Sequence, residues 1–190
     1  EPALPAIGAQ PFSILVSGVG GTGVVTISAI LGMAAHLEGK GVGVIDMAGL
    51  AQKGGAVYCH VKIANKPEEV HAIRVAAGEA DLALGCDLVV AGTKKVLAAI
   101  DKGHTGVFVN STEVYPGEIT RVADFTLPGE RVKTAIRDAA GENYGFVDAS
   151  AAATALLGNY IGANMFMLGV AWSQRRQAPN AWPSDYVHRR

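Results

Sequence analysis

The residues best placed to do chemistry form a glycine motif near the start of the chain. The motif reads Gly18-Val19-Gly20-Gly21-Thr22-Gly23. It follows an apolar run at 12–17 and precedes a helical pattern at 22–37, which is the context of a dinucleotide-binding turn. We expect Gly18 to permit a tight turn, Gly20 to let backbone amides approach an anion, and Gly23 to allow close helix packing.

A candidate acid fits the same interpretation. Asp46 ends a predicted strand at 42–46 and follows Gly23 by 23 residues, which is the place of a ribose-binding acid. Taken alone, these residues predict an NAD or FAD site. The alternative is that the glycine turn only packs its helix and binds nothing, because a fold does not fix a function.

A second glycine-containing loop lies at 47–55 and has the sequence MAGLAQKGG. Long loops at the carboxyl ends of strands often carry function. Lys53, Gly54 and Gly55 combine a cation with accessible backbone amides, which suits a phosphate or a carboxylate. The alternative is a solvated lysine in a turn.

Composition argues against several other kinds of site. The formal net charge is -1 and paired arginines occur only at 175–176 and 189–190, so we expect no nucleic-acid surface. Cys59 and Cys86 are the only cysteines, and an iron–sulfur cluster needs about four thiolates, so this chain cannot hold one alone. We expect both cysteines to be small buried hydrophobes.

The five histidines show no metal-ligand spacing. His60 lies opposite the inward face of its predicted strand, so we expect it to be exposed near the glycine-containing loop. A lone histidine at such a place is more often structural than catalytic.

Length and periodicity predict a single α/β domain. Strands are predicted at 12–17, 42–46, 56–63, 107–110 and 144–147, helices at 22–37, 93–100 and 128–140, and further apolar runs at 82–84 and 88–91. The apolar stripe of the first helix comprises Val25, Ala29, Met33 and Leu37. Strands that alternate with helices form a mostly parallel, Rossmann-like sheet with helices on both faces.

The segment 149–172 contains no charged residue and is about long enough to span a bilayer. Two asparagines and the lack of basic flanks on one side argue against a membrane span. We predict a helix with one face on its own sheet and the other against a neighbouring domain or an identical copy. Gly158, Gly162 and Gly169 would let another backbone approach closely.

Taken together, GVGGTG, its helix and AQKGGAVYCHVKIA resemble the gamma domain of pyruvate, 2-oxoglutarate, 2-oxoisovalerate and indolepyruvate ferredoxin oxidoreductases. That family usually has GxGGQG and an Arg-Gly-Gly loop, whereas Thr22 and Lys53 stand at the corresponding positions here. Both departures, within DMAGLAQKGGAV, are similar to the fused indolepyruvate-type branch. The resemblance continues through 78–92 and 146–169 and covers most of 13–172.

The resemblance implies that this chain completes an assembly whose other domains hold thiamine diphosphate and iron–sulfur clusters. Such enzymes decarboxylate a 2-oxoacid, pass electrons to ferredoxin and transfer the acyl group to coenzyme A. The resemblance places an anion-binding turn at 20–23 and a second edge of the same cleft at 53–55. These loops would face the cleft used by coenzyme A or lie close to the thiamine-bearing domains.

Three functions stay open: a domain of a larger oxidoreductase, a self-standing NAD(P)-binding module, and a non-catalytic structural domain. The loop at 47–55 favours the first, because ordinary nicotinamide enzymes do not need it. We expect a linker at 1–11, the gamma domain at 12–172 and a polar tail at 173–190. With no signal-peptide pattern in view, we expect a cytoplasmic protein. The expected partners are other domains of the oxidoreductase, ferredoxin, and an identical copy that docks through 149–172.

Overall fold

The computed structural model describes residues 7–49, 55–113 and 129–177. Its strands are β1 (Phe12–Val19), β2 (Gly41–Ala48), β3 (Ala56–Ala64), β4 (Leu82–Gly85), β5 (Gly106–Asn110) and β6 (Tyr144–Val147). Its helices are α1 (Val24–Leu37), α2 (Leu88–Ala91), α3 (Lys94–Leu97), α4 (Gly129–Ala140), α5 (Ala149–Leu157) and α6 (Ala163–Gln177). Short 3-10 turns occur at η1 (Pro67–Glu69) and η3 (Tyr160–Gly162). All five predicted strands are therefore confirmed, and the apolar run at 82–84 forms β4.

The six strands of the described residues form one sheet in the order β2-β3-β1-β4-β5-β6. β1, β4, β5 and β6 pair in parallel, whereas β3 runs antiparallel to both of its neighbours, β1 and β2. The predicted class, a mostly parallel α/β sheet, is confirmed. The antiparallel strand between β1 and β2 was not foreseen.

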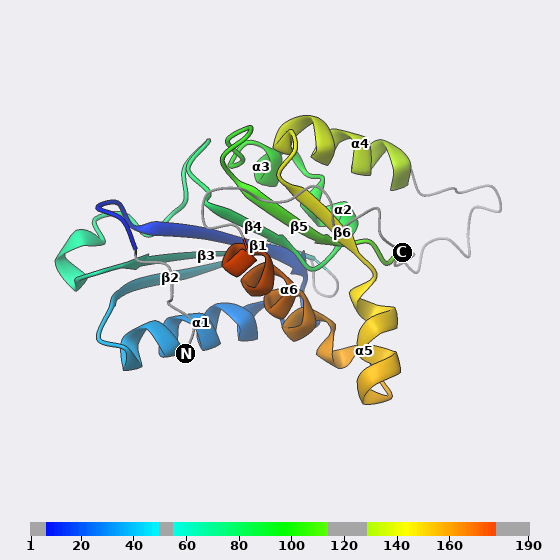
Figure 1. The fold of residues 1–190 in the computed structure, drawn as a ribbon, viewed down its shortest axis with the longest axis horizontal. Helices are drawn as coiled ribbons and strands as arrows, with labels where there is room; N and C mark the ends of the chain where they lie inside the picture. The colour runs from blue at the N-terminus through cyan, green and yellow to red at the C-terminus, as the bar shows by residue number, and fades with distance from the viewer. Residues whose placement is uncertain (1–6, 50–54, 114–128, 178–190) are drawn as a thin grey trace.

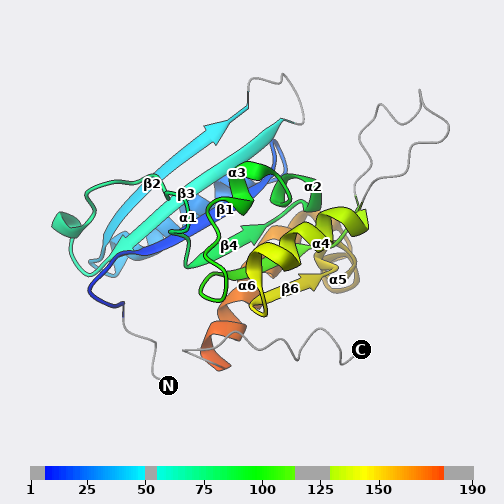
Figure 2. The same cartoon turned by 90° about the horizontal axis from the view of Figure 1, so that it is seen from above.

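Helices cover both faces of the sheet, as predicted (Figure 1). α1, α5 and α6 lie on one face, and α2, α3 and α4 lie on the other. Seen from above, α4 lies toward the edge of the sheet that contains β5 and β6, whereas α2 and α3 lie nearer its middle, toward β1 and β4 (Figure 2). The largest apolar core lies under α1 and α6, where it includes Val16, Ile27, Val61 and Met167.

The predicted apolar stripe of α1 faces outward. Val25, Met33 and Leu37 are 46%, 58% and 78% exposed. The helix instead packs the opposite side on the sheet, with Val24, Ile27, Ser28, Gly32 and Ala35 buried. α1 is apolar on both sides, so periodicity alone could not tell the inner stripe from the outer one.

The predicted continuous helix at 149–172 is wrong. α5 ends at Leu157 and is followed by Gly158, whose φ of 76° lies in the left-handed region, and α6 begins only at 163 and continues to 177. A Cβ on Gly162 would lie 2.4 Å from Leu157 Cδ1, so this glycine faces its own chain and not a partner. Gly169, by contrast, is exposed and has open space beside it. Among the described residues, no helix is both long and apolar enough to cross a membrane.

The segment 88–100 is divided into two short helices, α2 and α3. Thr93 precedes α3, as predicted, but its hydroxyl does not cap that helix. The hydroxyl donates a 2.8 Å hydrogen bond back to Val90 O instead. The Asp87 side chain caps the other short helix, α2, because its Oδ1 accepts a 2.8 Å hydrogen bond from Val90 N.

Candidate functional site

The glycine turn connects the carboxyl end of β1 to the start of α1. Gly21 and Gly23 have φ values of 85° and 91°, which residues with a side chain rarely adopt. At Gly18 a Cβ would lie 2.7 Å from Val24 Cγ2 and 3.0 Å from Cys86 Cβ. The roles expected of two glycines are therefore exchanged: Gly18 allows close packing, and Gly23 supplies the backbone conformation.

The turn meets the start of β3 directly. Gly20 N–H donates a 2.8 Å hydrogen bond to Gly55 O, and a Cβ on Gly20 would lie 3.4 Å from the same oxygen. The structure thus brings together parts of the two glycine-containing segments singled out in the sequence. It also corrects the expectation for the Gly20 amide, which is committed to Gly55 and is not free for an anion. Lys53 and Gly54 lie outside the described residues.

The start of α1 is suited to an anion. The first N–H groups of an α-helix have no partner within the helix, and Gly23 has no side chain to cap them. The helix dipole places partial positive charge at this end, and the first turn carries no acidic residue. Gly21, Thr22 and Gly23 are exposed, so a phosphate or carboxylate can approach these amides from outside.

Asn164, at the start of α6, fixes the turn from the far end of the chain. Its Nδ2 donates a 2.7 Å hydrogen bond to Thr22 O, and the residue is 8% exposed. The Thr22 hydroxyl in turn donates a 2.7 Å hydrogen bond to Val19 O. Sequence reasoning used Asn164 only against a membrane span. The signal available was an amide side chain within an uncharged, apolar segment.

Asp46 is separated from β1 by the intervening strand β3. In dinucleotide-binding folds the corresponding two strands are direct neighbours, which places the acid next to the glycine turn. Asp46 Oδ1 accepts a 2.8 Å hydrogen bond from the hydroxyl of Ser28, a buried residue of α1. Asp46 therefore links β2 to α1. Because it does not lie on a strand next to β1, it does not support the NAD or FAD interpretation.

The ends of β5 and β6 carry polar residues that the sequence did not single out. Asn110 Oδ1 accepts hydrogen bonds from Ala149 N at 3.1 Å and from Thr112 N at 3.3 Å. Asp148 Oδ1 accepts from Ala151 N at 3.0 Å and so caps α5. This bond and a second one from Thr112 lower the pKa of Asp148. The hydrogen bonds of both side chains hold the segments that follow β5 and β6 in place.

Cys59 and Cys86 are free and buried, as expected. Burial is the main cause that raises the pKa of each thiol to about 12, so both stay protonated near neutral pH. A protonated, enclosed thiol is a poor metal ligand. Within the described ranges, no group of three or more His, Cys, Asp or Glu side chains is placed to hold a metal ion.

The expectation that His60 is exposed is wrong. His60 is only 3% exposed, on the face of β3 opposite Cys59 and Val61. Its Nδ1 accepts a 3.1 Å hydrogen bond from Val75 N, because the segment that follows η1 folds back across β3. This segment therefore covers the polar face of β3. The alternation of polar and apolar residues along the strand did not predict it.

The fold and turn define an α/β domain that resembles dinucleotide-binding proteins but has an additional antiparallel strand beside β1. The sequence matches the family Pyruvate ferredoxin/flavodoxin oxidoreductase over residues 13–181, and the chain belongs to this family. The resemblance stated from the glycine motifs is thereby confirmed. The chain is accordingly a gamma-type component of a larger 2-oxoacid:ferredoxin oxidoreductase.

Two curated relatives are named indolepyruvate oxidoreductase subunit IorB. The protein from Methanothermobacter thermautotrophicus is 31% identical over 162 residues, which cover 84% of this chain and 77% of the relative. The protein from Thermococcus kodakarensis is 29% identical over 161 residues, which cover 84% of this chain and 76% of the relative. Both relatives are subunits, so partner subunits are expected for this chain as well.

Two solved structures show the same fold. Pyruvate oxidoreductase subunit PORC from Thermotoga maritima has a TM-score of 0.58 at 21% identity and aligns over 85% of this chain and 75% of its own. The 2-oxoglutarate:ferredoxin oxidoreductase from Magnetococcus marinus has a TM-score of 0.60 at 20% identity, over 87% of this chain and 24% of that chain. The latter was solved with 2-oxoglutarate, coenzyme A and succinyl-CoA bound.

Proposed function

We propose that this chain is the gamma domain of an indolepyruvate ferredoxin oxidoreductase that forms an acyl-CoA and reduces ferredoxin. Family membership and the two indolepyruvate oxidoreductase relatives support the substrate class. Thiamine diphosphate and iron–sulfur clusters belong on other domains in this proposal. The task of this chain is to bind and orient coenzyme A at the interface with those domains.

The observation that carries this proposal is the contact between Gly20 and Gly55. It joins the glycine turn and the start of β3 into one continuous surface. Lys53 precedes Gly55 by two residues in the sequence and lies outside the described residues. Exposed amides at the start of α1, together with a cation this close to Gly55 in the sequence, suit the phosphates of coenzyme A.

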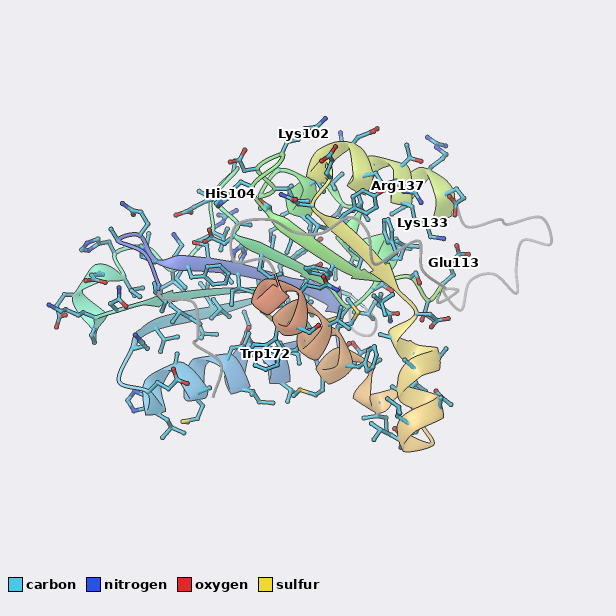
Figure 3. The ribbon with its side chains drawn as sticks, viewed as in Figure 1. Lys102, His104, Glu113, Lys133, Arg137 and Trp172 are labelled. Carbon is cyan, nitrogen blue, oxygen red and sulfur yellow. The ribbon has the colours of Figure 1, made fainter. Side chains whose placement is uncertain are left out.

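An exposed apolar face supports assembly with neighbouring domains or an identical copy. It lies on α1, α5, η3 and α6, and its members are Val25, Ile30, Met33, Leu37, Leu156, Leu157, Tyr160, Ile161, Met165 and Trp172. We call this set the outer apolar face. Figure 3 shows Trp172 on this side of the sheet, and Lys133 and Arg137 of α4 on the opposite side. Clusters of exposed apolar side chains mark interaction surfaces.

The alternative, a self-standing NAD-binding module, predicts micromolar and saturable NAD binding by the chain. The strand inserted between β1 and β2 and the bond from Ser28 to Asp46 both argue against it. Titration calorimetry with NAD and NADP separates the two proposals. We expect no saturable heat, and micromolar binding that is lost in Asp46→Ala would favour the alternative.

The experiment for the proposed function is reconstitution with the partner subunits. We expect the assembled enzyme to reduce viologen with indolepyruvate and coenzyme A, and to prefer indolepyruvate to pyruvate and 2-oxoglutarate. The chain alone should reduce nothing, since it has only two cysteines and, in this proposal, the thiamine diphosphate belongs to other domains. Equal or better turnover of pyruvate by the assembled enzyme would remove the substrate assignment.

A further inference from the structure

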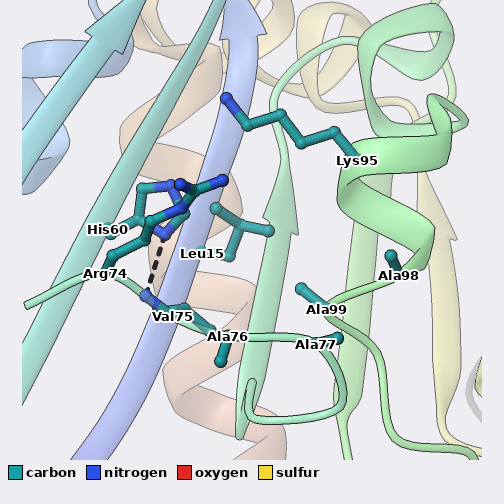
Figure 4. A pocket seen from close by; sticks show the side chains of 9 residues that line it. All are labelled: Leu15, His60, Arg74, Val75, Ala76, Ala77, Lys95, Ala98 and Ala99. Atoms are coloured by element: carbon teal, nitrogen blue, oxygen red, sulfur yellow. Dashed lines mark hydrogen bonds between the residues drawn. The ribbon is translucent and has the colours of Figure 1, made fainter.

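A cavity of about 420 Å³ lies on the polar face of β3, between β1, the segment 74–77 and α3 (Figure 4). Leu15 and several alanines form its apolar lining, and the polar members are His60, Arg74 and Lys95. No acidic side chain is among the described residues that line it. His60 is five residues along β3 from Gly55, or about 16 Å, so this cavity is separate from the glycine turn.

His60 presents a buried donor without an acceptor. Because Nδ1 accepts from Val75 N, the proton of the neutral ring must be on Nε2. Nε2 is fully buried and has no hydrogen-bond partner among the described residues. Buried donors are rarely left unpaired, since desolvation is not repaid. A histidine that only held the segment 74–77 in place would need Nδ1 alone.

Two cations add positive charge to the same cavity. Figure 4 shows Arg74 and Lys95 extending over it from opposite sides. No carboxylate of the described residues pairs with either, whereas Lys62 on the same strand face pairs with Glu79. Lys95 Nζ lies 4.0 Å from the centre of the Tyr58 ring and 3.8 Å from Met47 Sδ, contacts that leave its charge uncompensated.

These charges act on the pKa of His60. Burial, followed by the charges of Lys95, Arg74 and Lys62, lowers the pKa of the imidazole. Burial and Arg74 likewise lower the pKa of Lys95. Each positive charge in the cavity therefore raises the free-energy cost of keeping the other groups charged. A bound anion would lower that cost for all of them.

We propose that this cavity binds the oxyanion end of a small organic anion, a carboxylate or a phosphate, between His60 Nε2–H, Arg74 and Lys95. The guanidinium of Arg74 offers paired donors to two oxygens. Leu15 and the alanines accommodate a short apolar body behind the charged group. The volume fits a ligand of this size, since small-molecule sites commonly begin at about 300 Å³.

The test is a titration of the full 190-residue chain with inorganic phosphate and, separately, with butyrate. The readout is the ring ¹⁵N signal of His60 in histidine-labelled protein at low salt. We expect a saturable shift with a dissociation constant on the order of 1 mM for at least one probe. Saturation by phosphate alone assigns a phosphate group, and saturation by butyrate alone assigns a carboxylate.

Variants at the partly exposed cations avoid disturbing the core. Arg74→Gln and Lys95→Gln should each weaken binding roughly tenfold, since each removes a charge-assisted hydrogen bond. Lys94→Gln is the matched control, because Lys94 is the exposed neighbour of Lys95 and does not line the cavity. The proposal is overturned if neither probe gives a saturable shift, or if all three variants bind as the wild type does.

Discussion

The two faces of β3 are both covered, but by different material. Val57, Cys59 and Val61 point to the side of α1 and α6 and join the largest apolar core. His60 and Lys62 alternate with them and are also buried, at 3% and 5% exposure. His60 lies under the segment 74–77 and α3, and Lys62 pairs with Glu79. One strand therefore supplies a dry core on one side and a buried polar layer on the other.

The two sides of β3 contribute differently: the apolar side stabilises the fold, and the polar side is suited to binding a ligand. The apolar side gains free energy from burial, and its helices then carry a second apolar stripe outward for a partner. The polar side keeps an unpaired donor and two uncompensated cations, an arrangement that costs stability and suits a ligand. Variants on each side of β3, each with a matched control, test this difference.

The largest effect is expected within α1. Ile27→Ala removes a side chain that is 1% exposed in the apolar core, and should cost about 2–5 kcal/mol of unfolding free energy. Met33→Ala, on the outer stripe of the same helix, should change stability by less than about 0.5 kcal/mol. Urea unfolding measures both. Equal losses would mean that the inner and outer stripes of α1 are wrongly assigned.

The next effect concerns the outer apolar face. Met165→Glu places a charge beside Gly169 and Trp172, which share one stripe of α6 with residue 165. Association with partner subunits or with a second copy should weaken at least about tenfold, while the fold is retained. Analytical ultracentrifugation measures this, with Thr134→Glu on the exposed side of α4 as the control. Unchanged association would exclude α6 from the interface.

The smallest effect is a pH dependence on the polar side. Because the pKa of His60 is lowered from 6.5, the unfolded chain takes up a proton near pH 6.5 that the folded chain resists. Stability should therefore fall as the pH drops below about 6.5. Lys95→Gln removes a repelling cation and should make this decline shallower by under about 1 kcal/mol. Urea unfolding between about pH 5 and 8 tests this, and identical slopes in Lys95→Gln and Lys94→Gln would contradict it.

Most of the fold could be predicted, because the five predicted strands and the apolar run at 82–84 are short apolar segments that form strands, whereas the run at 88–91 forms the helix α2. The order of those strands could not, because β3 pairs with both β1 and β2 through backbone bonds that no side-chain pattern records. The break after α5 depends on the left-handed backbone of Gly158. A glycine inside an apolar run is compatible with a helix or with its end.

The candidate site was predicted in part. The glycine spacing predicted where the turn lies. Why a particular position must be glycine depends on its neighbours in three dimensions, such as Val24 and Cys86 around Gly18. Asn164 and the cavity around His60 depend on contacts between segments far apart in the sequence. Local periodicity contains no information about such contacts.

The central claim is that the glycine turn and the loop before β3 bind coenzyme A together. Lys53→Ala in the assembled enzyme should raise the KM for coenzyme A roughly tenfold, more than the KM for the 2-oxoacid, and the effect should shrink with added salt. Lys53→Arg should behave like the wild type, because arginine keeps the charge. A KM for coenzyme A that is unchanged in Lys53→Ala at low salt would contradict the account.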